Sequence, residues 1–395
     1  MRAVLADLTV PRYLLTAASR GRLGGLLALR DDLPVPPLPD APGWVRLRPE
    51  LAGICGSDLA VAHATSSLVL SGYYTAPRQI LGHEIVAVVE PTGERVVVDP
   101  VLSCVHRGFE PCRSCREGFP YGCERFDEPG VTGCRAPTQG FDAALGGGWG
   151  DYLVAHESQL HPVGDLPARR AVLAEPAAVA LHAALRWERR GDRAVVIGPG
   201  TIGLLVTAAL RRLHPDLDVT VLVPGQFGRE QAERVGATRT LSSGPGAVAG
   251  LARHHGGRVI RPRMTRTPIL ERGVDVVFDC VGHSATIDLG LHLLRPTGML
   301  VLVGAAGRQR VDWSLVWNRQ LTVQGTVYSG PEPALGGRST MSEVVTWLAD
   351  PAFPVDGLVT HTYPLDEWRK ALATATAGPR AGAVKVAFRV GCRSS

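Results

Sequence analysis

Residues 193–203, RAVVIGPGTIG, decide the fold of the second half of this chain. The apolar run at 194–197 predicts a buried strand, and a helix is expected from about residue 201. The glycines between them fit the spacing G-x-G-x-x-G. Such glycines allow a tight turn and a close approach to a pyrophosphate, which the N–H groups of the helix N-terminus stabilise. This context predicts dinucleotide binding by Gly198, Gly200, Thr201, Ile202 and Gly203.

Alternating strand and helix patterns follow this stretch. Strands are expected at DVTVLV (218–223), VDVVFDCVG (274–282) and GMLVLVGAAG (298–307), and helices at GREQAERVGA (228–237) and SATIDLGLHLL (284–294). The alternation predicts a parallel, doubly wound sheet of the Rossmann type. Ligands of such sheets bind at the carboxyl ends of the strands, so we expect the nicotinamide ribose and ring near Val281, Gly282, Gly304 and Ala305.

The end of the second strand bears on the choice of cofactor. An NAD site usually has an acidic residue there, about 20 residues after the glycines. This strand ends Val223-Pro224-Gly225 without a carboxylate, and Arg229 follows. Because an arginine can pair with a 2′-phosphate, NADP is favoured over NAD. The alternative is that Arg229 is an ordinary solvated charge on a helix.

The first part of the chain has a different character. Residues 11–43 are rich in Pro, Arg and Gly and predict an extended segment or loop, and residues 80–101 predict short antiparallel strands. The sequence therefore indicates a mostly-β domain over 1–168, with a long N-terminal insertion at about 13–42. A Rossmann domain is expected over 169–330, with a surface insertion at 256–272, and residues 331–395 are expected to return to the first domain.

Composition excludes several classes of protein. The 395 residues are 45% hydrophobic and 20% charged, which is typical of a globular protein, and the net charge of +5 is not gathered in a basic block that would suggest nucleic-acid binding. Lys370 and Lys385 are the only lysines, and neither follows a glycine-rich turn, so a lysine-dependent phosphate loop or Schiff base is not expected. No run of 18 apolar residues and no secretory signal occurs, which favours a cytoplasmic protein without a membrane partner.

Four of the eight cysteines fall within twenty residues. In a large chain without an export signal, such crowding indicates metal binding before disulfides. Four thiolates can close a tetrahedral zinc shell, which makes a structural site that leaves no position for substrate. The candidate ligands are Cys104, Cys112, Cys115 and Cys123.

A second set of candidate metal ligands is spread over 120 residues. Cys55 lies in GICGSD (53–58), His83 and Glu84 lie in GHE, and Glu175 begins an EP pair at the start of a helix. Thiolate, imidazole and carboxylate are ligands that zinc accepts, and three protein ligands leave a fourth position for substrate.

These motifs, in this order, resemble zinc-dependent medium-chain alcohol dehydrogenases, and most closely the polyol, sugar and threonine dehydrogenase branch. The resemblance covers residues from about 44 to the C-terminus. It implies a GroES-like, mostly-β catalytic domain beside the Rossmann domain, with Cys55, His83 and Glu175 binding a catalytic zinc. It also implies that Glu84 is an exchangeable or neighbouring carboxylate, that Ser57 hydrogen-bonds the substrate oxygen, and that Asp58 orients His83.

Two departures from the family pattern stand out. The family usually has its first cluster cysteine three residues before the second, where this chain has Phe109, so either Cys104 reaches in, or Cys134 substitutes, or the site is incomplete. The histidine that often relays the alcohol proton is replaced by Ala60, which leaves His63, water or a cofactor ribose hydroxyl as alternatives.

The resemblance implies an enzyme that transfers a hydride between a secondary alcohol and NAD(P) through a zinc-bound alkoxide. A polyol, sugar, cyclitol or β-hydroxy compound fits as substrate. A C=C or C=N reductase on the same scaffold, and a catalytically silent NAD(P)-binding redox sensor, are the alternatives. A homodimer or homotetramer joined near residues 298–329 is also expected.

Overall fold

The computed structural model describes residues 1–19, 25–72, 74–264 and 267–391. Two compact units are present. The first comprises 1–178, 328–349 and 359–395, and the second comprises 179–327 and 350–358. Residues 20–24 of the N-terminal insertion and 265–266 of the surface insertion lie outside the described residues.

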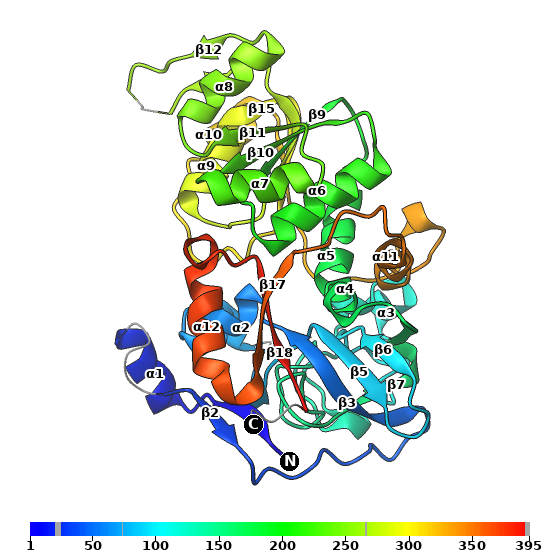
Figure 1. Cartoon of the computed structure of the whole chain (residues 1–395). Coiled ribbons are helices and arrows are strands. Elements are labelled where there is room, and N and C mark those ends of the chain that lie inside the picture. Colours follow the sequence, from blue (N-terminus) through cyan, green and yellow to red (C-terminus); the bar gives the residue numbers. More distant parts are fainter. Residues whose placement is uncertain (20–24, 73, 265–266, 392–395) are drawn as a thin grey trace. The chain divides into compact units, whose positions relative to one another are not determined.

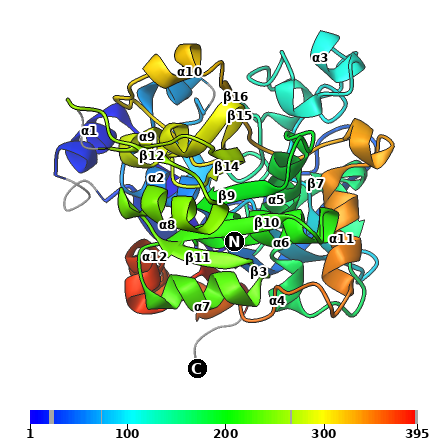
Figure 2. The same cartoon turned by 90° about the horizontal axis from the view of Figure 1, so that it is seen from above.

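The second unit is built on a six-stranded sheet in which every neighbouring pair is parallel. Figure 2 shows the strands in order, from β16 near the top of the view to β11 below. This sheet confirms the predicted doubly wound fold. Its strands, in spatial order, are β11 (Arg239–Ser242), β10 (Asp218–Val223), β9 (Arg193–Ile197), β14 (Val274–Asp279), β15 (Leu294–Leu302) and β16 (Thr322–Gly325).

Helices connect these strands. Residues of α8 and α9 share one apolar cluster with the sheet, whereas α6 and α7 contact each other and the strands β9, β10 and β11. The insertion at 256–272 contains a small antiparallel pair, β12 (Val259–Ile260) and β13 (Ile269–Leu270). The helices are α5 (Ala174–Leu185), which carries residues of both units, α6 (Thr201–Leu213), α7 (Gln226–Arg234), α8 (Gly246–His255), α9 (Ser284–Leu293) and α10 (Ser314–Asn318).

The first unit has a larger, mostly antiparallel sheet around β3 (Trp44–Gly53). The last part of the chain contributes a strand to this sheet, where β18 pairs with β3. The other strands are β5 (Ile85–Val89), β6 (Arg95–Val98), β7 (Leu153–His156), β8 (Leu160–Pro162), β17 (Val359–Pro364) and β18 (Lys385–Arg389). The helices are α2 (Gly56–Ala62), α3 (Arg113–Arg116), α4 (Ala168–Ala171), α11 (Thr340–Ala349) and α12 (Trp368–Ala377) (Figure 1).

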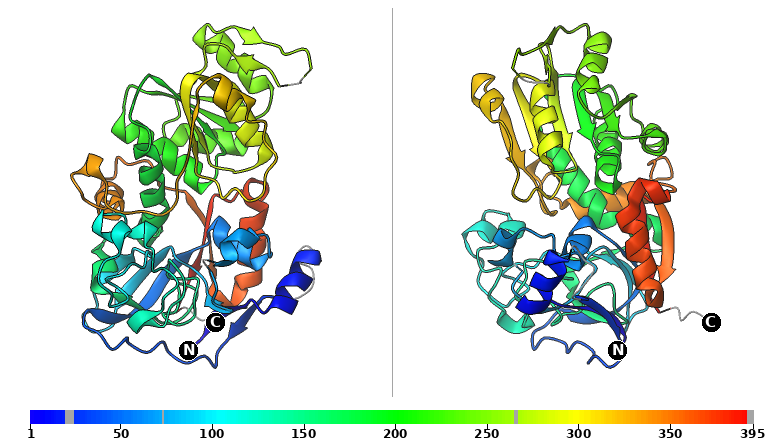
Figure 3. Two further views of the ribbon diagram at one scale, coloured as in Figure 1. Left: turned by 180° about the vertical axis from the view of Figure 1, so that it is seen from behind. Right: turned by 90° about the vertical axis from the view of Figure 1, so that its left-hand side faces the viewer.

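The N-terminal segment corrects one expectation. Residues 11–18 were predicted to be extended or looped, but they belong to the helix α1 (Val10–Ala18), which lies between the paired strands β1 (Ala3–Asp7) and β2 (Leu27–Arg30). The proline at position 11 is compatible with this helix because it occupies the first turn, where its missing N–H removes no intrahelical bond. Figure 3 (left) shows this helix on the outside of the first unit. The Tyr13 hydroxyl donates to the Ser66 carbonyl oxygen at 3.3 Å, which ties the helix to the segment after α2. The strand β1 also pairs with β4 (Arg78–Ile80).

Candidate metal centres and cofactor site

Cys55, His83 and Glu84 come together in the first unit. One potential ligand atom from each lies within 4.8 Å of the other two. His83 and Glu84 are buried, and Cys55 is partly exposed. A thiol, an imidazole and a carboxyl in this arrangement are chemically suited to a zinc ion, and the partial exposure of the thiol leaves one side open.

Asp58 fixes the backbone on both sides of this cluster. Cys55 is the N-cap of α2, and its N–H donates to Asp58 Oδ2 at 2.9 Å. The Gly82 N–H donates to Asp58 Oδ1 at 3.4 Å. Gly82 adopts a φ of +90°, and a Cβ there would meet the Trp149 ring, so only glycine fits this turn. One fully buried carboxylate thus connects the loop of Cys55 with the loop of His83.

The His83 ring is held between a charge and an aromatic face. Its Nδ1 lies 3.5 Å from Asp58 Oδ1, which is an ion-pair distance rather than a short hydrogen bond, and its ring stacks on Phe141 with the centroids 5.3 Å apart. Burial opposes protonation of His83, but Asp58 and Cys55 outweigh it and raise the pKa of the imidazole well above its ordinary value. The Asp58 carboxylate thus faces Nδ1 of the His83 ring.

Lys385 is the residue that the sequence interpretation missed. Its Nζ lies 2.6 and 2.7 Å from the two oxygens of Glu84 and donates to the Ile54 carbonyl oxygen at 3.1 Å. Burial disfavours the charged amine, yet the charges of Glu84 and Cys55 raise the pKa of Lys385 above its usual value. A Cβ at Gly53 would overlap the Glu84 carboxylate, so the glycine makes room for this pair. The signal in the sequence was a solitary lysine in the apolar strand AVKVAFRV.

Glu175 lies near this cluster but outside the group of three. Its side chain is buried in the first turn of α5. Burial raises the pKa of Glu175 to about 7, the positive charge of His83 acts in the opposite direction, and the Glu84 carboxylate adds to the rise. The structure therefore places two buried carboxyls in the neighbourhood of His83, of which Glu84 belongs to the group of three with Cys55.

Cys104, Cys112, Cys115 and Cys123 form a second group, with one sulfur atom from each within 4.8 Å of the others. The sulfurs of Cys104 and Cys123 are 3.6 Å apart, and the Cys112 N–H donates to the Cys104 sulfur at 3.3 Å. Four thiols converging without a disulfide match the donor set of a closed zinc site.

A tight turn allows Cys104 to reach this group from further back in the chain. The N–H groups of Arg107 and Phe109 both donate to the Cys104 carbonyl oxygen, at 3.1 and 3.0 Å. Phe109, which stands where the family has a cysteine, is instead covered by the Arg125 guanidinium, 3.6 Å from the ring centroid. Cys134 lies outside the group, and burial raises the pKa of its thiol to about 12.

In the second unit, the glycines of GPGTIG have distinct backbone roles. Gly198 has a φ of +99°, and a Cβ at Gly203 would overlap the Gly198 carbonyl oxygen. Gly200 is the N-cap of α6 and faces open space. The turn is therefore tight where helix and strand meet and unobstructed at the helix N-terminus that carries Thr201 and Ile202, as a pyrophosphate site requires.

Two family models match separate parts of this chain. Residues 41–165 match the alcohol dehydrogenase GroES-like domain, and residues 201–350 match the zinc-binding dehydrogenase domain. The chain belongs to the zinc-binding alcohol dehydrogenase family. It is accordingly a zinc-dependent oxidoreductase of the alcohol dehydrogenase type, as the resemblance implied.

The relatives of this dehydrogenase include enzymes for polyols and for threonine. Erythritol/L-threitol dehydrogenase of Mycolicibacterium smegmatis is 29% identical over 359 residues, covering 85% of this chain and 88% of that protein. L-threonine 3-dehydrogenase of Xanthomonas oryzae pv. oryzae is 26% identical over 373 residues, covering 91% and 95%.

Solved structures show the same fold. The crystal structure of 2R,3R-butanediol dehydrogenase from Bacillus subtilis has a TM-score of 0.71 at 22% identity, covering 98% of this chain and 99% of that chain. A short chain alcohol dehydrogenase from Escherichia coli CFT073, complexed with NADH, has a TM-score of 0.73 at 20% identity, with the same coverage.

The remaining candidate residues of the dehydrogenase make the following contacts in the structure. Gly282 and Gly304 approach each other after β14 and β15, and a Cβ on either would meet the backbone of the other segment. Arg229 donates to the Thr240 hydroxyl at 3.0 Å, a contact within the domain that does not by itself favour NADP. His63 is partly exposed, and its Nε2 lies 3.0 Å from the Thr376 hydroxyl.

No helix among the described residues is long and apolar enough to span a membrane.

Proposed function

We propose that this dehydrogenase oxidises a secondary alcohol that carries a second polar group close to the reacting carbon, such as a polyol, sugar, cyclitol or β-hydroxy compound. The observation that carries the proposal is the convergence of Cys55, His83 and Glu84 on one partly open position. The relatives that act on erythritol or L-threitol, L-threonine and D-arabinitol support the choice of substrate class.

Cys55 and His83 would hold the catalytic zinc, and Glu175 or Glu84 would supply a carboxylate. Zinc in such a site is a Lewis acid that lowers the pKa of a hydroxyl. Lys385 keeps the two oxygens of Glu84 engaged, which favours Glu175 as the lasting ligand and Glu84 as the exchangeable one. The four cysteines from Cys104 to Cys123 would hold a second, structural zinc.

Ser57 and Asp58 would serve the reaction from the first turn of α2. The Ser57 hydroxyl would hydrogen-bond the substrate oxygen, and Asp58 would keep the His83 ring in its orientation. With Ala60 in place of a histidine, the proton would leave through water or through His63, which lies one turn further along the chain and contacts Thr376.

Two tyrosine hydroxyls near His83 support a polar substrate. The hydroxyls of Tyr74 and Tyr328 are 2.6 Å apart, and the Tyr74 ring packs on Phe141, which in turn stacks on His83. Burial raises the pKa of Tyr74, so its hydroxyl stays protonated and can donate a hydrogen bond. Such a pair could bind a neighbouring hydroxyl or amine of the substrate, which a simple alkyl alcohol lacks.

Hydride would pass to the nicotinamide of NAD(H) or NADP(H), bound by Gly198–Gly203 and by the segments at Val281-Gly282 and Gly304-Ala305. The end of β10, Val223-Pro224-Gly225, has no acidic residue, which supports use of NADP as well as NAD. The Arg229→Ala variant tests this preference. If Arg229 binds the 2′-phosphate, the variant should bind NADP more weakly and NAD with unchanged affinity.

A homodimer or homotetramer would form through the edge strand β16. This strand ends the parallel sheet, and Trp313, Trp317 and Val327 are exposed around it. A paired edge and covered tryptophans would remove both unsatisfied backbone groups and apolar surface. Light scattering of the purified protein measures the state directly.

A cofactor-reduction screen tests the proposed activity. Polyols, sugars, cyclitols and β-hydroxy compounds are supplied in parallel with NAD and with NADP, and simple secondary alcohols serve as the comparison. The proposal expects turnover with a member of the first group and a kcat/KM at least about tenfold lower for the simple alcohols. Turnover only with C=C or C=N substrates, or with none, would reject it.

A further inference from the structure

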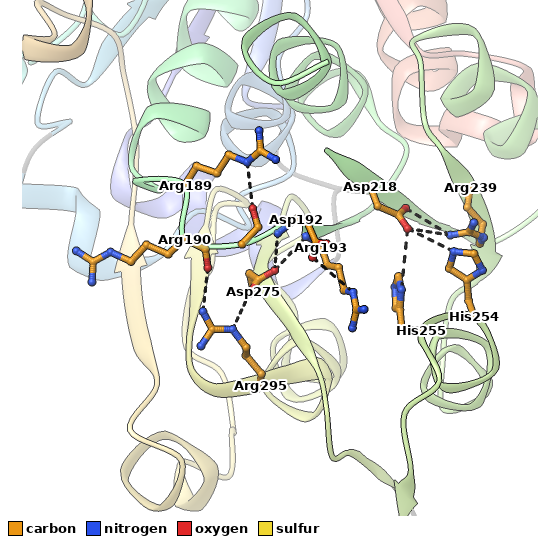
Figure 4. A network of polar contacts seen from close by, with 11 residues as sticks. Arg189, Arg190, Asp192, Arg193, Asp218, Arg239, His254, His255, Asp275 and Arg295 are labelled. Atoms are coloured by element: carbon orange, nitrogen blue, oxygen red, sulfur yellow. Dashed lines mark hydrogen bonds and ion pairs between the residues drawn. The ribbon is translucent and has the colours of Figure 1, made fainter. Parts of the chain in front are cut away.

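A third group of metal-ligating side chains belongs to the second unit, whereas both cysteine-containing centres belong to the first. Asp218 begins β10, and His254 and His255 are the last two residues of α8. Figure 4 shows both imidazoles directed at the Asp218 carboxylate. One potential ligand atom from each of the three lies within 4.8 Å of the others.

The distances suit a small cation. His254 Nε2 is 3.3 Å and His255 Nδ1 is 4.0 Å from the same oxygen, Asp218 Oδ2. Tetrahedral zinc with bonds of about 2.0–2.2 Å to nitrogen and oxygen separates its ligand atoms by roughly 3.3–3.5 Å. The first separation already falls in that range, and a small rotation of the His255 ring brings the second into it.

The surrounding charges leave the ligand atoms available. Arg239 Nη1 lies 3.4 Å from both carboxylate oxygens, so it can keep Oδ1 while Oδ2 faces the imidazoles. Arg193 and Arg239 are cations that face the group, and each has a carboxylate partner: Arg193 pairs with Asp192, and Arg239 pairs with Asp218 itself.

The group is separate from the cofactor site. Asp218 is paired in parallel with Arg193, the first residue of β9, whereas the glycines of GPGTIG follow the last residue of that strand. Amino and carboxyl ends of parallel strands lie at opposite edges of a sheet. The three side chains therefore lie at the amino ends of the strands, opposite the carboxyl ends, where the cofactor is expected to bind.

We propose that Asp218, His254 and His255 form a peripheral binding site for a divalent transition metal, with Zn²⁺ as its ion. Two imidazoles and one carboxylate are a common ligand set for this ion, and exposed His254 leaves a fourth position to water. The metal joins the end of α8 to the start of β10, which are 37 residues apart in the chain. Because it binds the folded state alone, it stabilises the second unit.

Zinc titration of the full-length, zinc-loaded protein tests this site. Isothermal calorimetry and equilibrium dialysis with Zn²⁺ at pH 7.5 should detect one further equivalent in the natural protein. His254→Gln and His255→Gln should each weaken that binding by at least about tenfold, since loss of a ligand costs no less than loss of an outer contact. His292→Gln is the matched control, because His292 is a partly buried histidine of the same unit that bonds the Asp288 carbonyl oxygen.

Two outcomes overturn the proposal: no further equivalent in the natural protein, or the same affinity in His254→Gln, His255→Gln and His292→Gln. If a histidine variant folds poorly by circular dichroism, Asp218→Asn replaces it, and its zinc binding should also fall. Binding should weaken below pH of about 6, where protons compete for the imidazoles. The readout is metal binding rather than turnover, so failure here leaves the proposed dehydrogenase activity untouched.

Discussion

The two cysteine-containing centres of the first unit differ in how they are assembled. Cys104, Cys112, Cys115 and Cys123 come from one stretch of twenty residues and offer four thiols of one kind. The centre at Cys55 instead combines a thiol, an imidazole and a carboxyl, and its surroundings draw on the last strand of the chain through Lys385. A uniform, closed donor set suits a structural ion, whereas a mixed set with a nearby ion pair suits an ion that exchanges ligands.

The largest expected effect concerns the centre formed by Cys55, His83 and Glu84, here called the open centre. Cys55→Ala should lower kcat by more than about a thousandfold, because it removes the ligand that no neighbour can replace. Cofactor binding should remain, since the glycines lie in the other unit. Zinc content should fall from two ions to one, counted after removal of any ion bound at Asp218. Full turnover in the zinc-deficient variant would contradict the assignment.

Loss of a ligand from the four-cysteine group, here called the closed centre, should lower the stability of the fold rather than the rate of the reaction. Cys104→Ser removes one of four ligands, and a loss of about 2–5 kcal/mol should lower Tm by on the order of 5–15 °C. Cys134→Ser is the matched control: it is an equally buried cysteine of the same loop region that lies outside the group. Calorimetry with zinc analysis compares them. Equal zinc loss in the two variants would show that Cys104 is not the fourth ligand.

Loss of Lys385 should lower both the stability of the fold and the activity of the open centre. Lys385→Met leaves the Glu84 charge buried without its partner, which typically costs about 3–5 kcal/mol. The freed carboxylate should also compete for the metal position, so kcat should fall while Lys385→Arg restores most of it. Thermal unfolding and steady-state kinetics of both variants measure this. If Lys385→Met and the natural protein had the same Tm and kcat, Lys385 would not have the stabilising role described here.

The smallest effect should come from the tyrosine pair. Tyr328→Phe and Tyr74→Phe each remove one hydroxyl of the pair and should raise KM for a polyol by about three- to tenfold, the equivalent of roughly one hydrogen bond. A simple secondary alcohol should show no change, because it has no group for the tyrosines to bind. An equal rise for both substrates would indicate a packing role instead.

Local patterns in the sequence were enough to predict the strand, glycine turn and helix at 193–213, because a single segment carries all three signals. The helix α1 was mistaken for an extended segment because composition outweighed the position of its proline. The Glu84–Lys385 pair joins residues 301 positions apart, and no periodicity reports such a contact. Which of Cys104 and Cys134 approaches the other cysteines depended on the backbone turn at 104–109, which spacing alone does not reveal.

Anomalous diffraction at the zinc absorption edge, on crystals of the zinc-loaded protein, tests the central claim most directly. Besides any ion bound at Asp218, we expect one peak among the four cysteine sulfurs and another between Cys55 and His83, with a carboxylate oxygen within about 2.2 Å of the ion at Cys55. A fully metallated crystal with no peak between Cys55 and His83 would contradict the account.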